Sequence, residues 1–157
     1  MKQIPLTQGK FALVDDEDFQ ELSKYKWCAV RQYNNKIYAV RDMLFDWKRK
    51  NLKMHRFLMN TPKLLHTDHI DWNWLNNQKS NLRVCTHQEN MMNQGKRKNN
   101  TSGFKGVSWD KWNKKWRARI QVSLKLKHIW YFVTKEDAYE AYCTACIKYH
   151  WEFANIW

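Results

Sequence analysis

Glycine and long hydrophobic runs are both scarce in this sequence. Glycine occurs four times in 157 residues. No apolar stretch approaches the ~18–20 residues that a membrane-spanning helix needs, so we expect no membrane segment. The N-terminus lacks the basic and then apolar layout of a secretory signal. The four cysteines are scattered without the spacing of a disulfide framework, and Cys143-x-x-Cys146 lacks the second pair that a zinc site needs. We therefore expect an intracellular, cytoplasmic protein.

Acidic residues are outnumbered by basic ones. The sequence has 15 Asp and Glu against 28 Lys and Arg, which gives a net charge of +13. This excess favours a polyanionic partner, because each phosphate neutralised by Lys or Arg releases condensed counterions. A ribosomal protein, an RNA-binding protein or a merely basic surface would show the same balance, so the charge indicates only the class of partner. The length allows one large or two small domains.

The first third of the chain has the alternation of apolar and polar residues that is typical of strands. We interpret residues 1–53 as an N-terminal β-rich region, with strands predicted at 11–14, 27–30 and 37–40. The acidic residues 15–18 predict the start of a helix, because negative charge there favours the helix dipole. The pair Asn34-Asn35 lies between two strand-like runs and predicts a hairpin turn.

The last third of the chain predicts a separate small fold. Residues 96–102 are polar and basic and predict a linker that can lie along a phosphate backbone. Strands are predicted at 104–109, 115–122 and 127–132, and Thr134 with Asp137 predicts a helix start. Apolar residues at helical spacing continue to Tyr149. We therefore expect an α+β protein whose residues 103–157 form a three-stranded antiparallel sheet packed on one helix.

Residues 54–95 are rich in His, Asn and Asp. They contain a D-H pair at 68–69, the pattern N-N-x-x-x-N-L-R over 76–83 and T-x-x-x-N over 86–90. In these motifs and their spacing the segment resembles the core of the HNH, or ββα-metal, nucleases, particularly the homing endonucleases of phages and introns. The resemblance implies a metal-dependent nuclease core over 54–95. The alternative is that these polar residues only cap turns and satisfy buried backbone groups.

The resemblance implies roles for four residues. His69 would be the general base, and a histidine with an ordinary pKa near 6.5 is suited to taking a proton at neutral pH. Asp68 and Asn90 would be the metal ligands, and their oxygens suit Mg²⁺ or another divalent cation such as Mn²⁺. Such an ion can stabilise the leaving oxygen as a Lewis acid. Asn81 would tie the ββ loop to the following helix, expected at 87–94, and help to orient His69.

Two further residues of this segment have open interpretations. His55 either packs against the residues of the site without itself taking part in the chemistry, or it simply begins a helix. Arg83 either holds a phosphate or is a solvated strand residue.

Residues 99–157 resemble the ERF-type (APETALA-type) DNA-binding domain, which is known from plants and is also found appended to HNH homing endonucleases. The residues that carry this resemblance lie at 102–109, 115–120, 131–132 and 136–142. Alternation places Trp116, Ala118 and Ile120 toward the helix. Four polar residues would face outward into a DNA major groove: Lys115, Arg117, Arg119 and Gln121. Further candidates for contact with DNA are Lys105, Trp109, Lys125 and Lys127. The alternative is a solvated charged face.

Tryptophan is abundant where glycine is scarce. The chain has 10 Trp and 4 Gly, whereas typical usage would give about 11 glycines. Six tryptophans lie in turns or polar stretches, or where the resembled family has glycine: Trp47, Trp72, Trp74, Trp112, Trp130 and Trp151. UGA is read as glycine in some bacterial lineages, so we hypothesise that these six are glycine codons in the source. The alternative is true enrichment in aromatic residues for DNA contact. We interpret Trp27, Trp109 and Trp116 as true tryptophans and leave Trp157 undecided.

These observations favour one function over two others. The first is a phage or mobile-element endonuclease that nicks or cleaves double-stranded DNA at a recognised site, with no obligate protein partner. The second is a sequence-specific DNA-binding protein without catalysis. RNA is a weaker third substrate, because A-form RNA does not offer the accessible major groove that such a sheet enters.

Overall fold

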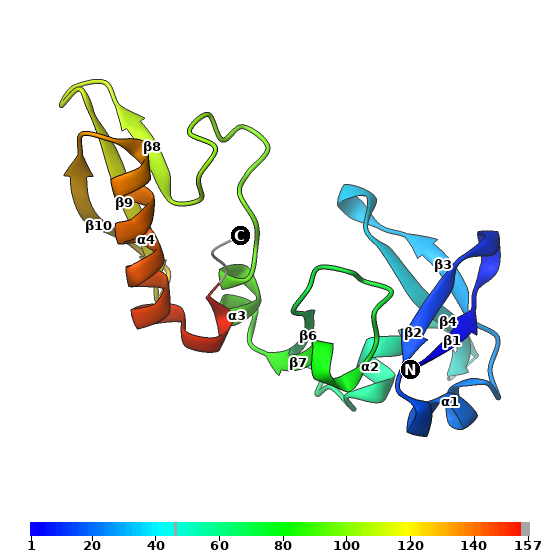
Figure 1. Ribbon diagram of the computed structural model, residues 1–157. Helices are drawn as coiled ribbons and strands as arrows, with labels where there is room; N and C mark the ends of the chain where they lie inside the picture. Colours follow the sequence, from blue (N-terminus) through cyan, green and yellow to red (C-terminus); the bar gives the residue numbers. More distant parts are fainter. Residues whose placement is uncertain (46, 155–157) are drawn as a thin grey trace. The chain divides into compact units, whose positions relative to one another are not determined.

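The structure, a computed structural model, describes residues 1–45 and 47–154. The chain divides into two compact units, Met1–Thr86 and His87–Trp157. Each unit combines antiparallel strands with helices, so the α+β prediction is confirmed (Figure 1). Among the described residues, no helix is long and apolar enough to cross a membrane.

The first unit contains small antiparallel sheets and short helices. Its strands are β1 (Lys2–Pro5) paired with β2 (Phe11–Val14), then β3 (Cys28–Arg31), β4 (Ile37–Phe45) and β5 (Lys48–Lys53) in that order across one sheet, and β6 (His66–His69) paired with β7 (Leu82–Cys85). Its α-helices are α1 (Asp16–Leu22) and α2 (Met54–Leu58). Short 3-10 turns occur at Thr7–Gly9, Tyr33–Asn35 and Lys79–Asn81.

The core of the first unit lies between these strands and helices. Trp27, Leu22 and Met54 are its largest buried apolar side chains. The Trp27 indole Nε1 donates a hydrogen bond of 2.9 Å to the Leu22 carbonyl, which satisfies the one polar group of a buried indole. Burying a large apolar side chain stabilises the fold by about 1.5–3 kcal/mol, so this cluster joins the helices to the sheets.

Most of the predicted elements of the first unit are present. The predicted helix begins at Asp16. Strands β2, β3 and β4 each begin within one residue of the predicted start. A turn that includes Asn35 joins β3 to β4. The sequence did not predict how far the sheet continues. Strand β4 runs on to Phe45 and pairs along its second half with β5.

The second unit is a three-stranded antiparallel sheet covered by one helix (Figure 1). Its elements are α3 (His87–Met92), β8 (Val107–Asp110), β9 (Lys115–Val122), β10 (Lys125–Phe132), α4 (Lys135–His150) and a 3-10 turn, Trp151–Phe153. Helix α4 buries Ala138, Tyr142 and Cys146 against Ala118 and Ile120 of β9. The predicted cap is present, since the Thr134 hydroxyl accepts a 3.1 Å hydrogen bond from the Asp137 amide.

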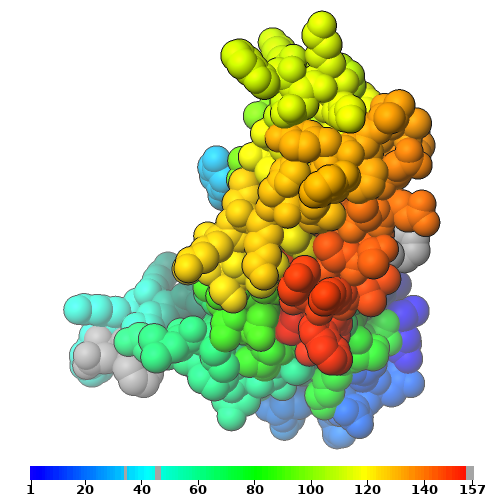
Figure 2. Space-filling view, turned by 90° about the vertical axis from the view of Figure 1, so that its left-hand side faces the viewer, coloured from blue at the N-terminus to red at the C-terminus, as the bar shows by residue number. Residues whose placement is uncertain are grey.

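The start of β8 differs from the prediction. We expected a strand from residue 104, but it begins at Val107. Gly106 has a φ of 75°, and a Cβ atom there would lie 2.1 Å from the Tyr142 ring. The backbone therefore turns at Gly106 and cannot extend as a strand before it. Figure 2 shows the turn between β8 and β9, in yellow-green, projecting from this unit, and Trp112 within it is 94% exposed.

Candidate functional site

The D-H pair lies on β6, and both side chains are buried, with 8% of Asp68 and 3% of His69 exposed. Asp68 is directly opposite Arg83 in the β6–β7 register. The Arg83 Nε and Nη2 atoms donate to the Asp68 Oδ2 at 3.0 and 2.8 Å. The ion pair is nearly enclosed, so it is much less weakened by water and salt than a surface pair. Arg83 is therefore a half-buried ion-pair partner of the candidate metal ligand, and a role in holding phosphate stays a prediction.

His69 lies in a cluster of aromatic and imidazole rings. The centroids of its ring and the His55 ring are 4.9 Å apart, with the planes at 89°. The Tyr38 ring lies 5.4 Å from His55 and 6.2 Å from His69. Burial lowers the pKa of His69 to about 4, although the Asn77 side chain and the carboxylates of Asp68 and Asp71 act in the opposite direction. The His69 imidazole is therefore uncharged at neutral pH.

The structure places His55 in a helix, whereas its supporting role in the site stays a prediction. It lies in the first turn of α2, and its ring packs on that of His69. Burial lowers the pKa of His55 to about 2, so two neutral imidazoles pack against each other without charge repulsion at neutral pH. Tyr38, on β4, is a contact of the site that the sequence reasoning missed. Its signal was only a place in an alternating strand, with nothing to indicate which residues it would meet.

The loop between β6 and β7 is organised around Asp71. The Asp71 Oδ1 accepts hydrogen bonds from the Asn73 amide at 2.8 Å and from the Asn81 Nδ2 at 2.9 Å. The Asp71 Oδ2 accepts one from the Asn76 Nδ2 at 2.8 Å. Asn81 also accepts from the Asp71 amide at 3.0 Å and donates to the Asn76 carbonyl at 2.9 Å. Asn81 therefore closes the loop that follows His69 and holds both of its ends.

The same loop is anchored to the N-terminal strands. The Leu13 amide donates to the Leu75 carbonyl at 2.8 Å, and the Asn77 amide donates to the Leu13 carbonyl at 2.8 Å. The Asp15 carboxylate accepts from the Gln78 Nε2 at 3.2 Å and from the Lys79 amide at 2.7 Å. The N-terminal strands therefore set the position of the loop, and through it the end of β6 that carries His69.

Three of the six tryptophans in the glycine hypothesis have a left-handed backbone. Trp47, Trp72 and Trp151 have φ values of 57°, 61° and 49°. Trp72 lies in the loop that follows His69. Trp74, Trp112 and Trp130 do not share this conformation, although the register of β9 and β10 shifts between His128 and Trp130. Trp157 lies outside the described residues.

Asn90, the other candidate metal ligand, lies in α3 of the second unit and is half-buried. Among residues 1–45 and 47–154, no three His, Cys, Asp or Glu side chains come together closely enough to hold a metal ion. The site on the first unit therefore consists of Asp68 and His69, with Arg83, His55 and Tyr38 around them.

The candidate DNA contacts are divided between the two faces of the sheet formed by β8, β9 and β10. Lys115, Arg117, Arg119 and Gln121 alternate with the buried Ala118 and Ile120, as predicted. Arg117 pairs with Asp110 at 2.9 Å, so part of its charge is already neutralised. The outward face of β9 thus retains Lys115, Arg119 and Gln121 as polar groups on one surface.

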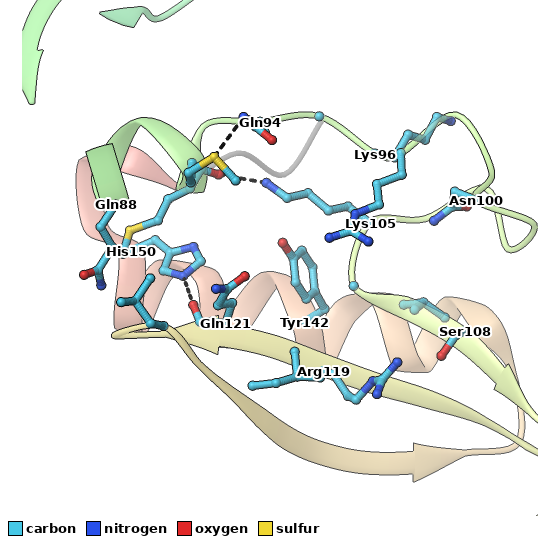
Figure 3. A pocket seen from close by; sticks show the side chains of 18 of the residues that line it. Gln88, Gln94, Lys96, Asn100, Lys105, Ser108, Arg119, Gln121, Tyr142 and His150 are labelled. Atoms are coloured by element: carbon cyan, nitrogen blue, oxygen red, sulfur yellow. Dashed lines mark hydrogen bonds between the residues drawn. The ribbon is translucent and has the colours of Figure 1, made fainter. Parts of the chain in front are cut away.

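The other candidates lie elsewhere on this unit. Lys125 and Lys127 are opposite Val122 and Ile120, on the side of the sheet that faces α4, and the Lys127 Nζ lies 4.7 Å from the Tyr149 ring centroid. The Trp109 ring packs edge-on against Trp116 at 5.2 Å. Lys105 is half-buried and donates to the Met92 carbonyl at 2.8 Å (Figure 3). These four residues do not share the outward face of β9.

Two curated proteins are similar to parts of this chain. Protein 3.8 of Escherichia phage T7 is 46% identical over 64 residues, which cover 41% of this chain and 53% of that protein. A protein of Acanthamoeba polyphaga mimivirus, named uncharacterized HNH endonuclease L560, is 34% identical over 106 residues, which cover 64% of this chain and 50% of that protein. The chain thus spans about half the length of these relatives.

No family model matches the chain, and no solved structure matches it. Both relatives are encoded by viruses, and one is named an HNH endonuclease.

Proposed function

We propose that this chain is a metal-dependent DNA endonuclease of the HNH type, encoded by a phage or mobile element, that nicks or cleaves DNA at a recognised site as homing endonucleases do. The observation that carries the proposal is the buried D-H pair on β6, with a neutral His69 next to an Asp68 held by Arg83. The similarity to a protein named an HNH endonuclease supports it independently.

The donor chemistry of two candidate residues suits a hard divalent cation. Asp68 offers a carboxylate and Asn90 an amide oxygen, and Mg²⁺ commonly binds one or two such groups and keeps waters in its other positions. In this proposal Asp68 and Asn90 hold Mg²⁺ or Mn²⁺. When bound, the ion supplies positive charge that stabilises the leaving oxygen.

The side chains of the first unit account for the other requirements of hydrolysis. The attacking water loses a proton to the neutral His69 as its oxygen forms a bond to phosphorus, the bond from phosphorus to the 3′ oxygen breaks, and that oxygen takes a proton from solvent. His55 and Tyr38 restrict the orientations of the His69 ring by packing on it. Arg83 keeps the Asp68 carboxylate in place through two charge-assisted hydrogen bonds.

DNA recognition belongs in this proposal to the second unit. Its sheet and helix have the architecture expected of an ERF-type domain, and we propose that residues 103–157 are such a domain. Lys115, Arg119 and Gln121 would then read bases or contact phosphates from the outward face of β9.

A plasmid-nicking assay with Mg²⁺ tests the proposal. The wild-type chain should convert supercoiled plasmid to nicked or linear forms. The variant His69→Ala should cut at least 100-fold more slowly, because general base catalysis contributes about 10²–10⁴-fold. It should bind the same DNA with unchanged affinity, because His69 is buried and remote from the second unit's sheet in the sequence.

His66→Ala is the matched control, because it removes a histidine from the same strand that the proposal leaves out of catalysis. Cutting by His69→Ala at the wild-type rate would exclude His69 as the base. If neither protein cuts any DNA yet both bind it, the chain is the non-catalytic DNA-binding protein of the second hypothesis.

A further inference from the structure

The second unit contains a cavity of about 620 Å³ beside the open edge of β9. Strand β8 pairs with β9 only as far as Ala118, so the edge of β9 beyond that residue has no strand beside it. The segment that follows α3 and the turn before β8 wall the cavity on one side, and Tyr142 of α4 faces into it (Figure 3). The volume lies in the ~300–1,000 Å³ range of small-ligand sites.

The charge of the cavity lining has one sign. The described residues that line it include no Asp or Glu. Four cationic residues line it: Lys96, Arg97, Lys105 and Arg119. Burial lowers the pKa of Lys105 and, together with the nearby Arg117, that of Arg119. An anion that entered the cavity would favour the charged forms of these side chains.

The segment that carries Lys96 and Arg97 is folded against the unit. The Lys96 Nζ donates to the Gly103 carbonyl at 3.1 Å. The Asn100 Nδ2 donates to the Phe104 carbonyl at 2.8 Å, and the Asn100 amide donates to the Arg97 carbonyl at 3.0 Å. Lys105 ties the turn to the end of α3 through the Met92 carbonyl. The cationic lining is therefore built by local contacts of this unit.

We propose that this cavity is a phosphate-binding site and that its ligand is a backbone phosphate of the bound DNA. Arg and Lys are the side chains that bind phosphate oxygens through charge-assisted hydrogen bonds. Amide side chains beside them, such as Gln121 and Asn100, can donate to sugar or phosphate oxygens. The assignment to DNA rests on the proposed function, whereas the phosphate chemistry rests on the lining alone.

The test measures how binding to a labelled DNA duplex depends on salt, without divalent ions. The full chain is compared with the double variant Lys96→Gln/Arg97→Gln by fluorescence anisotropy over a KCl series. Log K falls with log salt, and each phosphate contact adds about 0.9 to the steepness of that fall. The double variant should therefore give a line that is shallower than that of the wild type by about 2. It should then lose about tenfold less affinity than the wild type between 50 and 200 mM KCl.

The matched control is Lys135→Gln/Lys148→Gln, which removes two charges from α4 outside the cavity. Its slope should equal that of the wild type. An equal fall in both double variants would mean general charge attraction and would overturn the proposal. Cleavage plays no part in this assay, so a failure of the nicking assay leaves its result standing, and a failure here does not affect His69.

A second arm separates DNA phosphate from free phosphate. Inorganic phosphate is added to the full chain and to the cavity variant, and the amide signals of Gly106 and Gln121 are followed by NMR. Shifts in the wild type alone, with unchanged DNA slopes, would assign the site to a free phosphate and overturn the DNA assignment. No difference in either arm would refute the phosphate site altogether.

Discussion

Trp47, Trp72 and Trp151 have left-handed backbone angles that their side chains disfavour. A residue other than glycine pays about 1–2 kcal/mol in this region, and bulky residues are rare there. Three of the four glycines, Gly9, Gly103 and Gly106, also have a positive φ. Six described residues that are neither tryptophan nor glycine also have a positive φ, so the glycine-codon hypothesis stays a prediction.

Replacing these tryptophans with glycine should stabilise the protein. Trp47→Gly and Trp151→Gly should each raise the free energy of unfolding by about 1 kcal/mol, because glycine adopts a positive φ without a clash. Both side chains are largely exposed, at 90% and 79%, so little packing is lost. Urea denaturation followed by circular dichroism measures the change.

Trp112→Gly serves as the comparison for these variants. Trp112 is 94% exposed but has no positive φ, so glycine there should leave the stability unchanged or lower it slightly. Equal stabilisation by all three substitutions would remove the link to backbone strain. UGG codons at 72, 74 and 112 would end the codon hypothesis itself.

At the scale of single elements, the acidic run at residues 15–18 has two structural roles. The acidic run predicted a helix start, and α1 does begin at Asp16 with acidic residues in its first turn. Asp15, at the cap position, makes no side-chain cap bond and holds Gln78 and Lys79 of the β6–β7 loop. A residue that suits a helix start thus serves the candidate site.

The turn before β8 depends on one glycine, and Gly106→Ala tests this. An added Cβ would lie 2.1 Å from the Tyr142 ring at a φ of 75°, so the helix or the turn must shift. We expect a loss of about 2–4 kcal/mol in the stability of the second unit, from overpacking together with the strained backbone. Thermal unfolding by calorimetry measures it.

Gly103→Ala is the control for this substitution. Gly103 also has a positive φ, of 83°, but a Cβ there would meet nothing within 4 Å. It should therefore cost only the backbone term, about 1 kcal/mol. Similar losses for the two variants would mean that the close approach of Tyr142 does not matter.

At the scale of the whole molecule, the chain consists of two compact units, each with a buried cluster of its own. The boundaries expected from the sequence, at 53/54, 95/96 and 102/103, stay predictions. In the structure the N-terminal strands and β6–β7 belong to one unit, joined through Leu13 and Asp15.

Two units with separate cores should unfold in separate steps. Calorimetry should resolve two transitions, or one broadened transition that two components fit. Trp47→Gly should raise the temperature of one component and Trp151→Gly that of the other, because the two residues lie in different units. A single sharp transition that both substitutions shift equally would contradict this expectation.

The sequence by itself determined most of the secondary structure and the location of the candidate site. Alternation placed β9 with its buried residues, and capping chemistry placed the starts of α1 and α4, because these signals act between near neighbours in the chain. The resemblance to HNH nucleases implied a ββ loop around these residues, and Asp68, His69 and Asn81 do lie around the β6–β7 hairpin.

Only the tertiary structure decided what surrounds those residues. Tyr38 and His55 reach His69 from separate elements, and the cross-strand register brings Arg83 onto Asp68. The cationic cavity likewise forms where a long connecting segment folds against the edge of β9. Contacts between distant segments depend on how whole elements pack, and local sequence patterns carry no signal of that packing.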